Sequence, residues 1–379
     1  MKKIVLLVTG GAVSAALMEV PKTKNEAPHI LRIAREGAPL GTLYDPARFI
    51  TDLPTYISAL ATTLGNNESL PIDVCLAAPL TLSQTHTFTE ESPEQHTVTQ
   101  DEITQMIRKA SETFVQAHGS LLATLISGEP VALESLLLSS FLNGYSSSNP
   151  VGLTARTREY RVYTSLTSRA LLDTITSAVS TAWPRHTAIS FSSFSYSASQ
   201  SFANLLPEYD SVIIISIEEN HSDVVMVWND SIADTSTVTL GVNNYLSAVG
   251  QALSLDPTQT LSAIRLYAEG GATPEASVKI AEASREIRDT WMKAFSIAAA
   301  SALEEFFLPD RVVIVSGESG IAVALTHAFA EDLSHLSFTD STFNFLSLQE
   351  EITKRFILPE ADVQNPALML VCLFYARMV

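Results

Sequence analysis

Three turns in this sequence carry residue types that could bind a phosphate or a metal ion, and each follows a strongly apolar run. Thr9-Gly10-Gly11 follows IVLLV, residues 218–223 (EENHSD) follow VIIISI, and residues 316–320 (SGESG) follow RVVIV. A glycine turn after a strand lets the backbone approach a phosphate closely, and the third turn also opens a helical pattern whose first amides favour an anion. None is a Walker-type loop or a dinucleotide-binding fingerprint, so each turn alone is a weak indication of nucleotide binding.

The acidic second turn has two interpretations. Its side chains Glu218, Glu219, His221 and Asp223 could act as metal ligands or as a general acid–base set. On a strand–turn–strand, however, neighbouring side chains point to opposite sides, so few of them can converge on one ligand. A solvated turn is therefore the favoured interpretation.

Composition limits the class of protein. The chain has 379 residues, is 46% hydrophobic and 17% charged, and is long enough for two or three folded domains. Its net charge of −18 disfavours nucleic acid and anionic membrane surfaces, and it is compatible with a basic partner protein or a nucleotide–Mg²⁺ complex. No stretch reaches the ~18 apolar residues of a membrane helix. Cys75 and Cys372 lie in apolar runs without metal-ligand spacing, which predicts reduced core residues and favours the cytosol.

The N-terminal stretch MKKIVLLVTGGAVSAALMEVPK also has two interpretations. Its lysines and apolar run are typical of a secretory signal peptide, which would be removed from an exported protein. The glycine pair, however, interrupts the apolar run after IVLLV and favours a tight turn between two strands.

The hydrophobic pattern along the rest of the chain predicts alternating strands and helices. The residues at 45–65, 168–183, 199–206, 241–253, 274–307 and 366–379 are predicted to be helical, and a capping box of Thr99 and Glu102 opens another helix. Strands are predicted at 3–8, 12–20, 29–34, 72–82, 159–166 and 190–199, with a strand–turn–strand at 211–229 and a strand–turn–helix at 311–329. Turn residues mark a boundary near 144–152. Hairpins begin both halves, which predicts a duplicated α/β architecture.

The order of these elements resembles the actin-like ATPase superfamily, and within it the cell-division protein FtsA and the type IV pilus protein PilM. In that family two phosphate loops and an adenosine motif hold the nucleotide, and the matching stretches here are LLVTGGAVSAAL (6–17), SIEENHSD (216–223) and IVSGESGI (314–321). NPVGLTAR (149–156) resembles the point where the inserted subdomain of FtsA returns to the first lobe. The helices at 240–253 and 365–376 also match, so the likeness covers nearly the whole chain, through pattern more than identity.

The departures from the family pattern fall on the residues that metal and phosphate need. Leu7 or Val8 replaces the aspartate of the first loop, and Ser216 replaces that of the second, although Asp223 is retained. Glu218 stands where a glycine belongs, and a carboxylate there would crowd and repel phosphates.

In the third motif Gly317 is kept, while Ser316 and Glu318 take neighbouring glycine positions. The resemblance therefore implies a fold that has lost ATP hydrolysis. Because such a fold needs its first hairpin for the central sheet, the resemblance also favours the strand pair over the signal peptide.

We therefore expect a two-lobed, duplicated actin-like fold of the ribonuclease H-like type with a small inserted α+β subdomain. The expected boundaries are residues 1–70 plus 153–205 for the first lobe, 71–152 for the insert and 206–379 for the second lobe. The expected function is a cytoplasmic scaffold or adaptor and pseudo-ATPase in type IV pilus assembly or cell division, without catalytic residues, metal or cofactor. The alternative is a nucleotide-binding switch that holds ATP and Mg²⁺. Its candidate nucleotide-binding residues are Gly10, Gly11, Glu218, Glu219, Asn220, Gly317, Glu318 and Ser319. A third hypothesis is a secreted binding protein.

Expected partners are pilus-assembly or division proteins, including a membrane protein whose basic cytoplasmic tail recruits this chain to the inner face of the membrane. Nucleic acid and direct membrane insertion are not expected, and self-association is left open.

Overall fold

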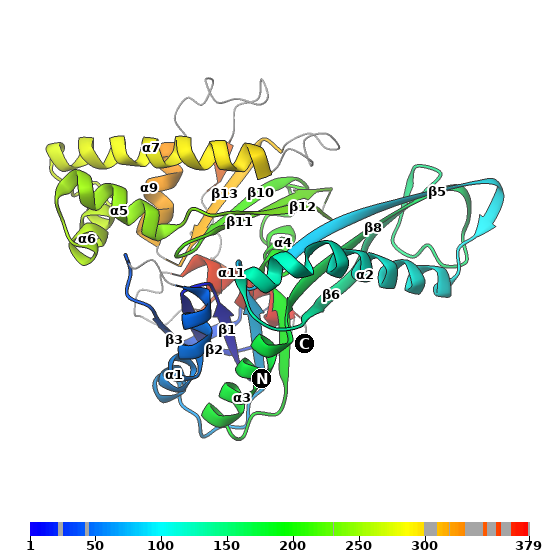
Figure 1. Ribbon diagram of the computed structural model, residues 1–379, viewed down its shortest axis with the longest axis horizontal. Helices are drawn as coiled ribbons and strands as arrows, with labels where there is room; N and C mark the ends of the chain where they lie inside the picture. The colour runs from blue at the N-terminus through cyan, green and yellow to red at the C-terminus, as the bar shows by residue number, and fades with distance from the viewer. Residues whose placement is uncertain are drawn as a thin grey trace.

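Two lobes and a projecting subdomain make up the protein (Figure 1). The computed structural model describes residues 1–21, 26–41, 45–229, 231–298, 309–317, 319–329, 344–346, 354–357 and 365–377.

The first lobe is built on a five-stranded sheet in the order β3-β2-β1-β4-β9. Its strands are β1 (Lys2–Val8), β2 (Ala12–Glu19), β3 (His29–Gly37), β4 (Ile72–Leu76) and β9 (Ile189–Ser193). One face is covered by the helices α1 (Pro46–Leu64) and α3 (Arg169–Ala182), whose apolar sides pack on Ile4, Leu6 and Val8. The N-terminal hairpin is thus confirmed as part of the central sheet, because β1 pairs with both β2 and β4.

The second lobe repeats this plan with a sheet in the order β12-β11-β10-β13-β14. Its strands are β10 (Val212–Ile217), β11 (Ser222–Trp228), β12 (Ser231–Val238), β13 (Arg311–Ser316) and β14 (Asn344–Leu346). Its outer helices are α5 (Val242–Leu253), α6 (Pro257–Ala268), α7 (Pro274–Ala298) and α9 (Ser319–Phe329). In both lobes an antiparallel hairpin is followed by a parallel strand, as the predicted duplication requires.

The helices α4 (Phe194–Leu205) and α11 (Pro366–Arg377) lie between the two sheets (Figure 1). One apolar core contains the buried face of both helices together with Val5 and Leu7 of the first sheet and Ile214 of the second. Cys75 and Cys372 are free and buried in this core, as predicted. Residues far apart in the sequence therefore form the joint between the lobes.

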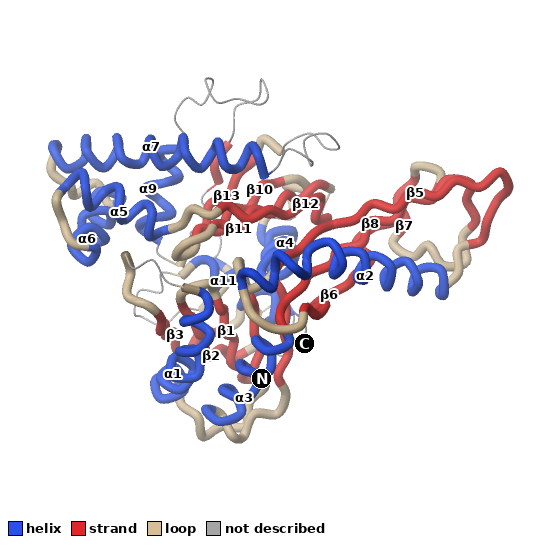
Figure 2. The backbone as a smooth tube through the Cα atoms, viewed as in Figure 1, coloured by secondary structure: helices blue, strands red, loops and turns tan. Residues whose placement is uncertain are grey.

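The inserted subdomain projects from the first lobe as a long twisted sheet with one helix on it (Figure 2). Its strands, in the order β5-β8-β6-β7, are β5 (Leu82–Thr97), β8 (Thr154–Ser168), β6 (Pro130–Leu142) and β7 (Tyr145–Ser147). The helix is α2 (Gln100–Leu125), and Thr99 caps it, since its hydroxyl oxygen accepts a hydrogen bond from the Glu102 N–H at 3.2 Å. The predicted capping box is only half formed, because the Glu102 carboxylate contacts His96 at 2.9 Å.

Three predicted boundaries differ from the structure. The residues of β4 were predicted to open the insert, but β4 pairs with β1 and β9 of the first lobe, and the insert's own strand β5 begins only at Leu82. Conversely, β8 was assigned to the first lobe, yet it pairs with β5 and β6. The serine-rich strand predicted at 190–199 ends at Ser193, where α4 begins. A continuous apolar pattern does not show where a chain leaves one sheet for another.

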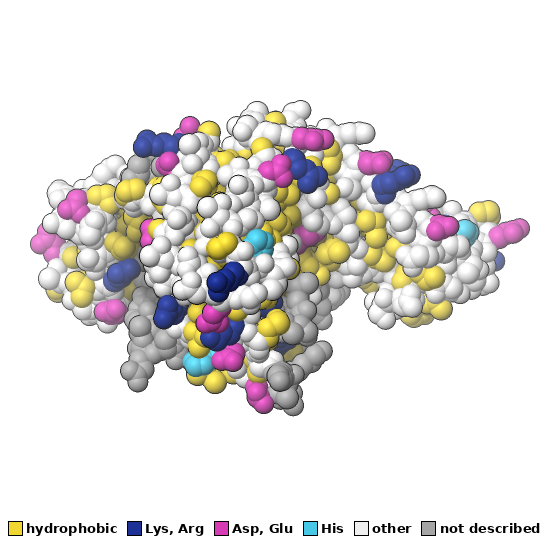
Figure 3. All heavy atoms as spheres, turned by 90° about the horizontal axis from the view of Figure 1, so that it is seen from below, with side chains coloured by type: hydrophobic (Ala, Val, Ile, Leu, Met, Phe, Trp, Pro, Cys, Tyr) yellow, Lys and Arg dark blue, Asp and Glu magenta, His cyan; other side chains and the backbone are white. Residues whose placement is uncertain are grey.

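Among the described residues, no helix combines the length and the apolar character needed to cross a membrane. In the view of Figure 3 the charged side chains are scattered between polar and apolar atoms and form no basic stripe.

Candidate functional site between the lobes

The first two predicted turns face each other across the boundary between the lobes. Thr9, Gly10 and Gly11 end the β1–β2 hairpin, and Glu218–His221 connect β10 to β11. Because the lobes are duplicates, the two hairpins point their turns at the same region. This arrangement brings Gly11 of the first turn against Glu219 of the second.

Glu219 crosses the boundary and fills the space beside the first turn. One carboxylate oxygen, Oε2, accepts a hydrogen bond from the Thr9 hydroxyl at 2.6 Å, and Oε1 lies 2.7 Å from the Arg35 guanidinium. The Glu219 side chain is only 8% exposed. A Cβ built on Gly11 would lie 3.1 Å from Glu219 Cβ, so the backbone of the first turn packs directly against this side chain.

Glu218 points away from that contact and is fully enclosed. Its Oε1 accepts a hydrogen bond from the Ser216 hydroxyl at 2.5 Å. Burial, and next the negative charge of Glu219, raise the pKa of Glu218 to about 8. At neutral pH this side chain is therefore mostly an uncharged carboxylic acid, because the un-ionised form avoids a second buried charge beside Glu219.

Asp223 makes a second link between the lobes. Its Oδ2 accepts a hydrogen bond from the backbone N–H of Ala78 at 2.9 Å, and its Oδ1 accepts one from the Thr237 hydroxyl at 3.3 Å. Burial raises the pKa of Asp223 to about 6. The prediction of a solvated acidic turn was therefore wrong for Glu218, Glu219 and Asp223, which are all buried. The local sequence could not reveal the opposite lobe that covers them.

Asn220 contributes to a third link through Asn243, the second residue of α5. Asn243 Nδ2 donates to the Asn220 side-chain oxygen at 2.9 Å, while Asn243 Oδ1 accepts from the N–H of Gly41 in the first lobe at 2.7 Å. Gly241 allows this approach, because a Cβ there would lie 2.4 Å from the carbonyl oxygen of Glu218.

The third predicted turn lies beside the second, because β13 pairs in parallel with β10 and Ser316 is opposite Ile217. Gly317 follows β13, and a Cβ built on it would lie 3.7 Å from Asn365 Nδ2, an ordinary contact distance. Ser319 opens α9, and Glu318 lies outside the described residues. The two glycines of the first turn also differ in role, because a Cβ on Gly10 would meet the Pro79 ring at 2.5 Å. Gly10 is thus required by packing within the first lobe.

Sequence reasoning missed Arg35 and Asn243 as members of the site, and it named Thr9 only as part of the first turn. Arg35 is a basic residue near the end of β3, and its position beside the first turn follows from the pairing of Ser14 with Arg35 between β2 and β3. Among the described residues, no three His, Cys, Asp or Glu side chains gather in a way that could hold a metal ion. The carboxylates of the site are engaged with partners from their own protein, and this arrangement holds the lobes together.

Comparison with known proteins identifies the fold of this chain. No protein-family model matches the chain, and no curated protein matches it. A solved structure described as the PilM–PilN type IV pilus biogenesis complex superposes with a TM-score of 0.66 at 14% identity, covering 100% of this chain and 98% of that one. The archaeal actin homolog Ta0583 gives 0.42 at 9% identity, covering 100% and 99%. The cytoplasmic domain of EpsL from Vibrio cholerae gives 0.40 at 7% identity, covering 99% and 94%.

The protein therefore has an actin-like ATPase fold, in which two duplicated α/β lobes carry an inserted subdomain. Among these structures the PilM protein of the pilus complex is the one whose similarity extends over the whole fold at a TM-score above 0.5.

Proposed function

We propose that this protein is an actin-like scaffold or adaptor, a pseudo-ATPase that works in type IV pilus assembly or cell division. The similarity of its fold to the PilM chain of a pilus biogenesis complex supports a role in such an assembly. The contacts at the boundary between the lobes support the loss of nucleotide chemistry.

The observation that carries the proposal is the position of Glu219. In an actin-like fold the nucleotide phosphates lie between the two hairpin turns, and here the Glu219 carboxylate lies between them, bonded to Thr9 and Arg35. A phosphate in this place would have to displace the carboxylate from Thr9 and Arg35. The carboxylate thus makes a contact between the lobes that a bound nucleotide would otherwise make.

The groups near the turns also suit Mg²⁺ poorly. Leu7 or Val8 stands where the family has the metal-binding aspartate, and neither side chain offers an oxygen ligand. Glu218 is mostly uncharged at neutral pH because burial raises its pKa, and Glu219 is engaged by Arg35. These features favour a scaffold over the alternative of an ATP-dependent switch.

The partners of such a scaffold would be other assembly proteins. The net charge of −18 favours a basic segment, such as the cytoplasmic tail of a membrane protein, which would recruit this chain to the inner face of the membrane. This location is part of the proposal.

Calorimetric titration with ATP and Mg²⁺ tests the proposal, using the wild-type protein, Glu219→Ala and the exposed control Glu269→Ala. We expect no saturable heat for the wild type or the control at millimolar ATP. A thermal-shift assay should agree, since a ligand at 100 times its Kd would add about 2.7 kcal/mol of stability.

Saturable binding by the wild type would overturn the pseudo-ATPase proposal and favour the switch. The Glu219→Ala variant then shows the role of the carboxylate, because tighter binding would mark Glu219 as a barrier and weaker binding would mark it as a ligand.

A further inference from the structure

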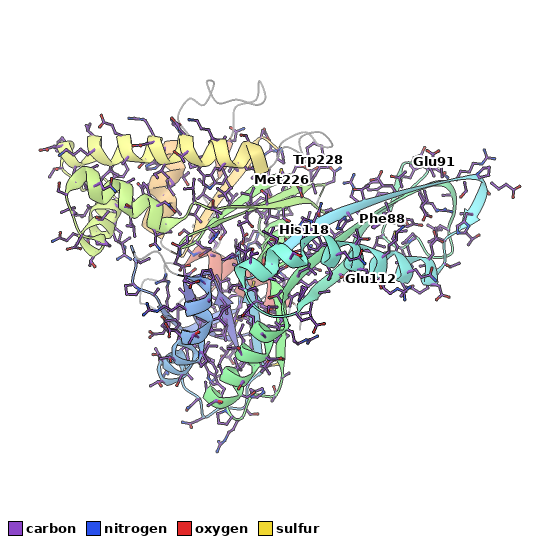
Figure 4. All side chains as sticks on the ribbon, viewed as in Figure 1. Phe88, Glu91, Glu112, His118, Met226 and Trp228 are labelled. Carbon is purple, nitrogen blue, oxygen red and sulfur yellow. The ribbon has the colours of Figure 1, made fainter. Side chains whose placement is uncertain are left out.

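The base of the inserted subdomain contacts both lobes. Its strand β5 begins beside β12 of the second lobe and runs out toward the tip of the insert (Figure 1). Figure 4 labels Phe88 and Glu91 farther along β5, and it labels Met226 and Trp228 on β11, the strand that pairs with β12. The insert therefore lies where it can bridge the two lobes.

Three side-chain hydrogen bonds join β5 to β12. The Ser83 hydroxyl donates to the Thr235 hydroxyl at 3.0 Å, and the Thr235 hydroxyl donates to the Ser83 carbonyl oxygen at 2.6 Å. The Thr85 hydroxyl donates to the Ile232 carbonyl oxygen at 2.9 Å. Ser83 and Thr85 are two positions apart in a strand, so their side chains point to the same side. One side of β5 is thus fixed to the second lobe.

The first lobe holds the insert through a carboxylate on β6. Glu134 accepts hydrogen bonds from the N–H of Ser193, at 3.1 Å, and from the Ser193 hydroxyl, directly before α4 begins. The Ser165 hydroxyl of β8 donates to the same carboxylate at 2.7 Å. A carboxylate at the N-terminus of a helix is stabilised by the helix dipole. The insert therefore has polar contacts with each lobe, and they come from different strands.

The strand β12 also connects the insert to the boundary between the lobes. Thr237 is two positions from Thr235 on this strand, and its hydroxyl donates to Asp223 Oδ1 at 3.3 Å. Asp223 Oδ2 in turn accepts from the Ala78 N–H at 2.9 Å, shortly before β5 begins. The second lobe thus contacts the chain both at the entry to the insert and along the first residues of β5.

We propose that the insert is a strap across the two lobes. In the closed state the contact of Ser83 and Thr85 with β12 stabilises the boundary between the lobes, and in the open state this contact is broken. A partner that separates β5 from β12 would loosen the boundary, and by linkage a loosened boundary would free the insert to the same extent. The inference goes beyond the proposed function, because it uses contacts within this chain and holds whether or not a nucleotide binds.

Hydrogen exchange at the Gly41 amide tests the proposal in the full chain, because this N–H donates to Asn243 in a separate contact between the lobes. The double variant Thr85→Val, Thr235→Val removes all three hydrogen bonds between β5 and β12. We expect exchange at Gly41 to become about fivefold faster or more, since one neutral hydrogen bond corresponds to roughly that factor. The matched control is Thr87→Val, an exposed threonine on the same side of β5, which should leave the exchange rate unchanged.

A second variant strengthens the strap. In Ser83→Cys, Thr235→Cys the sulfur atoms replace two hydroxyl oxygens that lie 3.0 Å apart, so glutathione disulfide should join them. The native Cys75 and Cys372 are fully buried and should not react. We expect the oxidised variant to exchange at Gly41 several-fold more slowly than the same variant after reduction with dithiothreitol.

Two results would overturn the proposal. One is an unchanged exchange rate at Gly41 in the valine variant, or equal rates in the oxidised and reduced cysteine variant, because the contact of the insert would then be independent of the boundary. The other is an equal increase in the interior of α1, which would indicate general destabilisation. The cysteine variant carries the test even if the valine variant folds poorly, and none of these outcomes bears on ATP binding.

Discussion

Arg35 supplies the positive charge opposite Glu219, beside a second buried glutamate. Replacing it by Met keeps most of the apolar stem but leaves the Glu219 carboxylate, 8% exposed, without its ionic partner. We expect Arg35→Met to lower the free energy of unfolding by about 2–4 kcal/mol, because an uncompensated buried charge is costly. The midpoint of urea denaturation measures this change.

The control is Arg48→Met. Arg48 is 75% exposed, and its nitrogen lies 3.9 Å from Asp52, so this pair should contribute less than about 1 kcal/mol. If the two substitutions lowered the free energy of unfolding equally, the contact of Arg35 with Glu219 would contribute no more than an exposed ion pair.

Glu218 should make the stability of the protein depend on pH. Burial raises its pKa from 4.5 to about 8, so the folded protein keeps a proton that the unfolded chain releases in this interval. Its contribution is therefore fully present below about pH 4.5 and is lost as the pH rises toward 8, with a slope of up to about 1.4 kcal/mol per pH unit. Asp223 also makes the free energy of unfolding decrease as the pH rises, over a lower pH range, because its pKa is raised to about 6.

Urea midpoints measured between pH 6.5 and 8 follow this effect, and the difference between the wild type and Glu218→Gln separates it from other titrating groups, including His86 and His221, whose pKa values burial lowers. The midpoint of the wild type should fall across this interval and that of Glu218→Gln should fall less. The exposed control Glu208→Gln should behave like the wild type. Parallel curves for all three proteins would contradict the assignment of a buried proton to Glu218.

At the scale of one element, α2 begins at a cap that its sequence specifies. Thr99→Ala removes the oxygen that accepts the Glu102 N–H, and a lost N-cap costs about 1 kcal/mol. Hydrogen exchange at the Glu102 amide should become roughly fivefold faster, since that factor corresponds to about 1 kcal/mol.

Thr104→Ala is the matched control, because Thr104 is an exposed threonine inside the same helix whose hydroxyl only donates to the Gln100 carbonyl. Similar exchange rates in the two variants would mean that the cap does not hold the first turn of α2.

Elements with a strong local pattern were predicted well, and elements that depend on distant neighbours were not. The hairpin β10–β11 and the helix α2 follow from apolar runs, turn residues and a cap. Beyond Leu82 the strand β5 was not predicted, because most of its residues are polar and partly exposed. Its extended form depends on pairing with residues of β8 that lie 57 to 84 positions later in the chain.

At the scale of the whole molecule, Asn243 links the second lobe to the first through the Gly41 N–H. Asn243→Ala removes this acceptor and also the contact with Asn220. We expect faster hydrogen exchange at Gly41, by about three- to tenfold, since a neutral hydrogen bond contributes about 1 kcal/mol.

The interior of α1 serves as the internal reference, because its amides are bonded within one helix of the first lobe. Exchange that increases equally in α1 would indicate general destabilisation and would contradict a specific contact between the lobes.

The sequence by itself determined the local structure and the class of fold. Apolar runs, glycine pairs and the Thr99 cap specify strands, turns and a helix through interactions within a few residues, and their order predicted the actin-like fold. The sequence also placed Gly11, Glu219 and Asn220 among the candidate residues of one site. Gly11 and Glu219 are in contact because the turns of the two duplicated hairpins face each other across the boundary between the lobes.

Only the tertiary structure decided what each of these residues does. The two neighbouring glutamates make different contacts. Glu219 contacts Thr9 and Arg35 across the boundary between the lobes, whereas Glu218 accepts a hydrogen bond from Ser216 of its own lobe. Burial, and next the charge of the adjacent Glu219, then set the pKa of Glu218. Such environments arise from packing, which no local pattern of residues encodes.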